Sequence, residues 1–301
     1  MPATLTMNDT DLSLPPELER NLRKRAGQLR MLPAVATEAL QIAKDPDCSL
    51  SEFAAVVERD LKLASDILKI ANSALYSPTV PITSLHRAVV RVGFRECQNL
   101  IMAASMASLM NRMSLEHEWI RGVLWRHSFN TALVAIHLNR TFHFGFGGDE
   151  FTAGLMHDFG RMLFAVAVPD QFAEIDPLEF EEPEAILDNE TAVIGTDHCR
   201  LGAWFARENQ LPEALIDVIL HHHQPNEARR ARRLTALIRV ADDMANHLQR
   251  HEESAGYQPE DNPALPVLKE FGEPGFATHF CEVAPALMQE AQKDAESLMQ
   301  L

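Results

Sequence analysis

Apolar residues recur at helical spacing through most of the chain, and this periodicity constrains the fold more than any other feature of the sequence. In the segment LKLASDILKIANSALY, Leu63, Ile67, Ile70 and Leu75 fall on one side of a helix. Residues 15–110 form a series of such patterns and contain no strand ladder. Hydrophobic residues make up 46% of the chain, which is enough for a sizeable core. The sequence therefore predicts an all-α fold.

Capping signals and loops divide this pattern into segments. Ser49 and Glu52 fit a capping box, and Thr83 or Ser84 can cap the helix that follows. A last helix is expected over residues 284–300. The expected organisation is a flexible leader over residues 1–14, a helical block over 15–112, a second block over 113–250, and a loop with a carboxy-terminal helical tail over 251–301.

The charge and the apolar runs exclude several classes of function. The chain has 27 Lys and Arg against 43 Asp and Glu, a formal net charge of -16, so nothing attracts it generally to nucleic acid or anionic membrane. The longest apolar run, residues 100–110, has about half the length of a membrane span. The start resembles no secretory signal, and the four cysteines form no CxxC pair. We expect a cytoplasmic protein that does not bind a membrane.

The second block contains an ordered series of histidines and aspartates on predicted helices: His127, the pair His157–Asp158 in GLMHDFGRM, His198, the histidine triplet 221–223, and the pair Asp242–Asp243. Imidazole and carboxylate groups are good ligands for Zn, Mn, Fe or Ni, and carboxylates also suit Mg. Neighbours on a helix point about 100° apart, so at most two residues of the triplet can be ligands. The alternative is a structural network in which buried His and Asp satisfy each other by hydrogen bonds.

Two basic clusters are candidate binding surfaces in this acidic chain. Arg87, Arg91 and Arg95 recur every four residues, which predicts a stripe on one helix. A denser cluster follows the histidine triplet and suits a nucleotide phosphate or an acidic partner segment. It consists of Arg229, Arg230, Arg232 and Arg233. The alternative for both clusters is a solvated helix face.

Several segments together resemble the HDOD domain, a branch of the HD superfamily of metal-dependent phosphohydrolases, over roughly residues 22–245. The stretch from MLPAVATEAL to NSALYS resembles the amino-terminal signature of that family and centres on Asn72 and Ser73. PITSLHRAVVRVGF, which ends near Gly93, resembles its next segment. WRHSFNTALVA, AGLMHDFGRMLF and the stretch from NETAVIG to LHHH resemble the HD half in order and spacing.

The resemblance implies a helical fold in two lobes, with an amino-terminal lobe packed on an HD-like lobe. It also implies a role in bacterial signalling, in a family generally regarded as lacking demonstrated hydrolase activity. The metal ligands that it carries over are His127, His157, Asp158 and Asp242, with His198 and His222 for a second metal. Asp243 is the alternative register for the closing aspartate.

Two departures from the bimetallic HD-GYP phosphodiesterases bear on activity. Arg161 stands where those enzymes typically have lysine, and it is a candidate phosphate contact. The loop with Gly-Tyr-Pro is missing after HHHQP, which argues against cyclic-di-GMP hydrolysis. We therefore expect a non-catalytic signalling module that binds a protein partner or a small ligand such as a nucleotide. The alternative is a metal-dependent phosphohydrolase acting on a nucleotide or another phosphoester, with Fe, Mn, Zn, Ni or Mg as the candidate cofactor.

Overall fold

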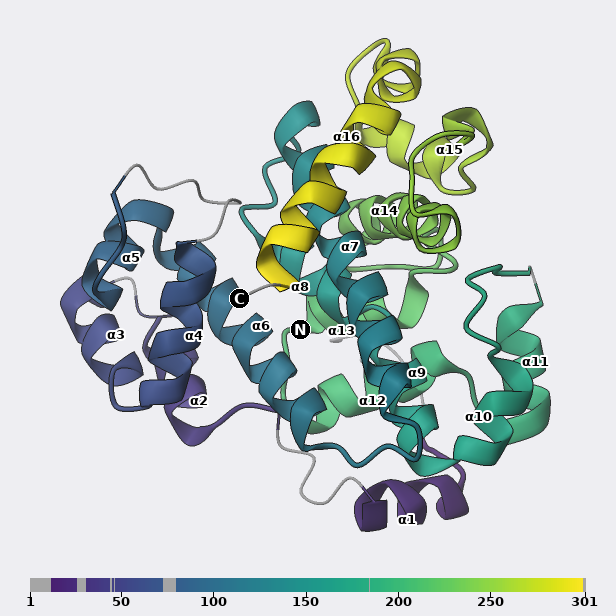
Figure 1. The fold of residues 1–301 in the computed structure, drawn as a ribbon, viewed down its shortest axis with the longest axis horizontal. Coiled ribbons are helices and arrows are strands. Elements are labelled where there is room, and N and C mark those ends of the chain that lie inside the picture. Colours follow the sequence, from purple (N-terminus) through teal and green to yellow (C-terminus); the bar gives the residue numbers. More distant parts are fainter. Residues whose placement is uncertain are drawn as a thin grey trace, which may run out of the picture.

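The structure, a computed structural model, describes residues 12–25, 31–43, 45, 47–72, 80–183 and 185–299, and these residues form helices and loops without a strand (Figure 1). The all-α prediction is confirmed. The helices are α1 (Pro16–Arg25), α2 (Ala34–Ile42), α3 (Leu50–Val57), α4 (Leu61–Ala71), α5 (Leu85–Val92), α6 (Phe94–Arg112), α7 (Glu118–Phe142), α8 (Asp149–Met156), α9 (Phe159–Ala167), α10 (Pro169–Ile175), α11 (Ile186–Ile194), α12 (His198–Glu208), α13 (Glu213–His221), α14 (Arg232–His251), α15 (Leu265–Leu268) and α16 (Phe276–Met299). None of them, in the described part of the chain, combines the length and apolar character of a membrane span.

Buried apolar side chains form two separate clusters. The smaller cluster joins α2 to α5 with the first half of α6, and the larger cluster contains most of the remaining helices. Helix α6 belongs to both, because Leu100 lies in the smaller cluster and Met106 in the larger. Figure 1 shows α2 to α5 grouped at one side, with α6 between this group and the rest. The two clusters fit the expected pair of lobes, whose boundaries stay predictions.

The two ends of the described chain both pack on the larger cluster. Helix α1 lies against α9 and buries Leu18 and Leu22 there, although the sequence grouped it with the first block. Helix α16 packs along α7, which runs through the middle of the molecule (Figure 1). Residues from both ends therefore help to enclose the helices that carry the His and Asp series.

The predicted helix caps are confirmed at two positions. The Ser49 hydroxyl accepts a hydrogen bond from the Glu52 backbone N–H at 3.1 Å, and Ser84, not Thr83, caps α5. The predicted start of the last helix is wrong, because α16 begins at Phe276. Pro285 lies inside that helix and not in its first turn, where proline is most easily accepted.

The predicted stripe of three arginines on one helix is wrong. Gly93 has φ +94°, a conformation that favours glycine, and it ends α5 before α6 starts at Phe94. Arg95 therefore lies on α6 and forms an ion pair with Asp149 at 2.6 Å.

The signature residue Asn72 joins two segments of the smaller cluster. Its amide donates to the carbonyl of Ile82 at 2.8 Å and accepts from the Ile82 N–H at 2.7 Å. The Asn72 side chain therefore satisfies both backbone hydrogen-bonding groups of Ile82, in the segment that leads into α5. The other signature residue, Ser73, lies outside the described residues.

Candidate metal centre

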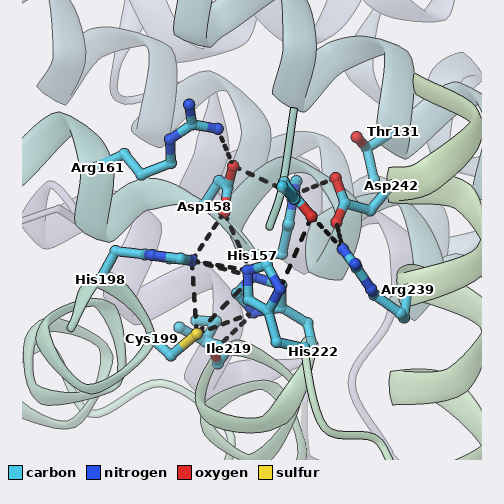
Figure 2. Close-up of polar contacts among 12 residues, drawn as sticks. Thr131, His157, Asp158, Arg161, His198, Cys199, Ile219, His222, Arg239 and Asp242 are labelled. Atoms are coloured by element: carbon cyan, nitrogen blue, oxygen red, sulfur yellow. Dashed lines mark hydrogen bonds and ion pairs between the residues drawn. The ribbon is translucent and has the colours of Figure 1, made fainter. Parts of the chain in front are cut away.

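The predicted ligands converge in the larger cluster, although they come from five different parts of the chain (Figure 2). The contributing elements are the middle of α7, the junction of α8 and α9, the first two residues of α12, the two residues that follow α13, and α14. These elements supply His127, His157 with Asp158, His198 with Cys199, His222 with His223, and Asp242. All the predicted metal ligands thus lie in one centre.

The backbone explains how two adjacent side chains, His157 and Asp158, face the same centre. Helix α8 ends before His157, and Asp158 adopts φ -101° and ψ 12° before α9 starts, so the chain turns between the helices. Gly154 lets α8 approach α7 closely, since a Cβ there would lie 2.6 Å from the Cα of Ala132. This contact brings His157 to His127.

Four donor atoms form a first group. The Nε2 atom of His127 lies 3.4 Å from Nε2 of His157 and 3.1 Å from Oδ1 of Asp242. Nε2 of His157 lies 3.4 Å from the same oxygen. Oδ2 of Asp158 lies 3.5 and 3.7 Å from the two imidazole nitrogens of His127 and His157. Donors around one tetrahedral ion, each about 2.0–2.1 Å from it, are separated by about 3.3 Å, so this group has the spacing of a metal site.

A second group lies on the other side of Asp158. Its Oδ1 atom lies 3.4 Å from Nε2 of His198 and 3.3 Å from Nε2 of His222, and those nitrogens are 3.4 Å apart. Nε2 of His223 lies 3.1 Å, and the sulfur of Cys199 3.5 Å, from Nε2 of His198. Asp158 therefore offers one oxygen to each group. The sequence missed His223 and Cys199 as candidate ligands; the triplet and the neighbour of His198 were their only signals.

The tautomers of two histidines point their lone pairs into the centre. Nδ1 of His157 lies 2.7 Å from the carbonyl oxygen of Gly154, and Nδ1 of His222 lies 2.9 Å from that of Ile219. A carbonyl can only accept, so each Nδ1 carries the proton and each Nε2 has a free lone pair when the ring is neutral. Metal-binding histidines are commonly oriented in this way, with the ring nitrogen that does not face the metal donating to a carbonyl or carboxylate.

His198 is oriented by a carboxylate. Glu190, which is 2% exposed, accepts from Nδ1 of His198 at 2.8 Å and from its backbone N–H at 2.8 Å. A carboxylate behind a histidine fixes its ring and raises its basicity. No sequence pattern indicates this role for Glu190, because the residue lies on α11 and the contact depends on the turn before α12.

The electrostatics of the centre call for positive charge. Although burial lowers it, the Cys199 sulfur and the Asp158 carboxylate raise the pKa of His222 to about 10. Burial alone would raise the pKa of Asp158, but His157 and Arg161 outweigh it and hold that pKa well below its ordinary value. Oδ1 of Asp158 is buried and makes no hydrogen bond with the described residues. Facing lone pairs and an unsatisfied carboxylate oxygen fit a divalent ion.

Each aspartate also accepts a hydrogen bond from an arginine, and Arg161 is buried while Arg239 is partly buried. Arg161 donates a hydrogen bond to Asp158 at 2.8 Å (Figure 2). It also donates two hydrogen bonds, of 2.7 and 2.9 Å, to Asp176. Arg239 donates to Asp242 at 2.7 Å and pairs with Glu182. Both edges of the Arg161 guanidinium are thus occupied by carboxylates. Its predicted contact with a phosphate stays a prediction.

The segment 177–182 covers the centre. The ring of Phe180 lies 4.8 Å from that of His127 and 4.9 Å from the guanidinium of Arg161. Leu178 and Phe180 have φ of +58° and +55°, which is uncommon for side chains of this size. The six predicted ligands are at most 3% exposed. The centre is therefore closed to solvent.

The closing aspartate of the series is Asp242. Asp243 faces away, because it accepts hydrogen bonds from Tyr257 at 2.8 Å and from Asn262 at 3.1 Å. This geometry selects one of the two registers that the sequence left open.

The four arginines of the predicted cluster lie in different environments. Arg232 forms an ion pair with Glu270 at 2.8 Å. Arg233 donates a hydrogen bond to the carbonyl of Phe144, and its guanidinium lies over the ring of Phe146. Only Arg229 and Arg230 are exposed. Ligand or partner binding by the four arginines stays a prediction.

Comparisons with known proteins agree with this architecture. Residues 29–225 match the family model of the HDOD domain. A protein from Treponema pallidum (strain Nichols), described as uncharacterized, is 28% identical over 210 residues, which are 69% of this chain and 40% of that protein. The match thus spans less than half of the length of that relative.

Two crystal structures have similar folds. An HDOD domain protein of unknown function from Geobacter sulfurreducens matches with a TM-score of 0.75 at 23% identity, over 94% of this chain and 98% of that one. A protein from Shewanella amazonensis SB2B, described provisionally as a phosphohydrolase, matches with a TM-score of 0.65 at 19% identity, over 94% and 99%. At these identities the likeness shows the fold alone.

Proposed function

The chain belongs to the HDOD domain family, and on that premise we propose that it is a signalling module that acts by binding a protein or a small ligand, not by turnover. The His and Asp centre is then a structural metal site that holds the helices of the larger cluster in register. When bound, a divalent ion supplies the positive charge that the buried carboxylates lack and ties several helices together.

The observation that carries this proposal is the closure of the centre. Phe180 packs on His127 and Arg161, and the candidate ligands are almost without exposure. A phosphoester substrate needs an open coordination position and a free cation near it. Arg161 and Arg239, the arginines beside the two aspartates, are already paired with carboxylates. This arrangement favours a structural ion over a substrate site.

The test is to measure metal content, melting temperature and phosphodiesterase activity in parallel on wild type and Asp158→Ala. The exposed Asp170→Ala is the matched control. We expect one or two equivalents of Fe, Mn, Zn or Ni in wild type, lost in Asp158→Ala together with several degrees of melting temperature, and no hydrolysis of bis(p-nitrophenyl) phosphate by any variant. Metal-dependent hydrolysis that disappears in Asp158→Ala would instead establish an enzyme.

One observation favours the second candidate, a metal-dependent phosphohydrolase. Asp158 offers its two oxygens to two donor groups, which is the layout of a two-metal hydrolytic site. In this reading the segment 177–182 has to leave the centre before a phosphoester can enter, and Arg161 then exchanges Asp176 for the phosphate. Turnover by Phe180→Ala in the presence of added Mn²⁺, with none by wild type, would support a gated enzyme over a structural centre.

A further inference from the structure

A cavity of about 500 Å³ lies directly outside the metal centre. Phe180 is the wall between the two, because it lines the cavity and also packs on His127. Cavities of roughly 300–1,000 Å³ are typical of sites for small molecules. The cavity is lined by the first half of α7, by residues 177–181 and by the carboxyl end of α14, so the helices that carry His127 and Asp242 also form its walls.

The lining includes an aromatic surface that nothing in the described chain covers fully. Trp119 lies in the first turn of α7 and is 60% exposed, one of the most exposed large apolar side chains. Tryptophan is rarely left so exposed without a partner, and its ring is a good platform for stacking a base.

The lining also includes cations that lack partners. Arg126 and Arg250 both border the cavity, and neither makes an ion pair or hydrogen bond with a residue that the structure describes. Other arginines near the centre, such as Arg161 and Arg239, are paired with carboxylates. Two unpaired guanidinium groups at one cavity, in a chain of net charge -16, suit a phosphate.

Acceptor groups complete the lining. The Oε1 atom of Gln249 is buried and has no hydrogen-bond partner among the described residues. Glu179 and Glu181 also border the cavity and can accept hydrogen bonds from sugar hydroxyls or an exocyclic amine. The cavity thus combines an aromatic face, two unpaired guanidinium groups and hydrogen-bond acceptors.

We propose that this cavity binds a nucleotide, with its base on Trp119 and its phosphates on Arg126 and Arg250. The inference rests on the proposed regulatory function, for which it supplies the small ligand. Arg126 is adjacent to His127 on α7, and Phe180 touches both the cavity and the centre, so an occupant contacts the elements that enclose the metal ligands. The bound nucleotide is the signal, and the segment 177–182 is the part of the chain that responds to it.

The experiment is calorimetric titration of the full-length, metal-loaded protein with GDP and with ADP. Guanosine tests the base without phosphate, and tripolyphosphate tests the phosphate without a base. We expect at least one nucleotide to bind, and to bind about tenfold or more tightly than either fragment. Arg126→Ala, Arg250→Ala and Trp119→Ala should each weaken that binding about tenfold or more. Arg20→Ala, an exposed arginine on α1, should leave it unchanged.

Three results with the nucleotide and its fragments would overturn the proposal. They are no nucleotide binding up to millimolar concentration, equal affinity for tripolyphosphate, and affinity that survives Arg126→Ala and Arg250→Ala. Capture of a phosphopeptide without nucleotide binding would also overturn it, in favour of a protein ligand. These outcomes are separate from those of the Asp158→Ala test, since metal content and hydrolysis are measured without nucleotide and the cavity variants leave the candidate ligands in place.

Discussion

Gly160 touches the backbone of His198 so closely that a Cβ atom on Gly160 would lie 1.9 Å from the His198 carbonyl oxygen. Gly202 faces the same crossing of α9 and α12, where its own Cβ would lie 2.9 Å from Ile219 and 3.3 Å from the N atom of Gly160. Helix α9 starts directly after Asp158, and α12 starts at His198. The two glycines therefore set the distance between Asp158 and His198 at the centre.

Replacing Gly160 with alanine should push α12 away and disrupt the second donor group. Because the clash is with backbone, we expect a loss of about 1–3 kcal/mol or more in the free energy of unfolding, measured in urea, and weaker metal binding. Gly122→Ala is the control: it is a helical glycine with nothing near its Cβ, so it should be neutral or stabilising by up to about 1 kcal/mol. Wild-type metal content and stability in Gly160→Ala would contradict this account.

The two donor groups should lose metal separately. His157→Ala removes a donor of the first group only, and His198→Ala removes one of the second. If wild type binds two ions, elemental analysis should show about one in each variant and fewer than one in Asp158→Ala, because Asp158 serves both groups. His117→Ala, an exposed histidine before α7, controls for the loss of any imidazole. Loss of all metal in only one of the two variants would mean a single ion.

The pH dependence of stability should contain a contribution from Glu150. Burial raises the pKa of this carboxyl, although Asn139 and the Gly148 N–H donate to it. A raised folded pKa gives stability that is complete below the unfolded pKa of about 4.5 and is lost as the pH rises through the folded value. Relative to Glu150→Gln, wild type should therefore gain free energy of unfolding as the pH falls from 7.5 to 5. A difference that stays constant over this range would show that Glu150 keeps its ordinary pKa.

Removing the cover should expose the centre to solvent. Phe180→Ala deletes the ring that packs on His127, so EDTA should extract the metal about tenfold faster or more, as followed with a colorimetric indicator. Phe280→Ala, at a fully buried phenylalanine of α16, should cost similar stability, about 3–5 kcal/mol, without opening the centre. Equal extraction rates in the two variants would mean that general unfolding, not the cover, controls access.

Much of the helical fold could be predicted because its signals are local. Apolar periodicity and the hydroxyls of Ser49 and Ser84 are read within one or two turns, and the structure has helices at those places. The predicted stripe of arginines on one helix was wrong because Gly93 ends α5, although the spacing of the arginines is regular. The side on which α1 packs depends on α9, far away in the sequence, so no local pattern reveals it.

The candidate site was predictable where the family resemblance reached and not beyond it. His127, His157, Asp158 and Asp242 lie together as expected. The roles of Cys199, Glu190 and Arg239 could not be predicted in this way. Their contacts depend on how the helices pack and on which side chains this packing brings together. Arg161 has the residue type of a phosphate contact, but Asp176, which occupies its other edge, could not be identified as its partner from spacing.

The centre contains side chains from residues 127 to 242, so metal binding there would affect the stability of a long stretch of the chain. Ions held by the two donor groups would close the intervening loops at the centre, which limits the unfolded chain as a cross-link does. On the proposed metal role, the folded fraction then rises with the concentration of free ion by mass action. Since cells remove unfolded molecules, the abundance of the protein would then follow the supply of the metal, and scarcity of the metal would lower it by degradation without any dedicated sensor.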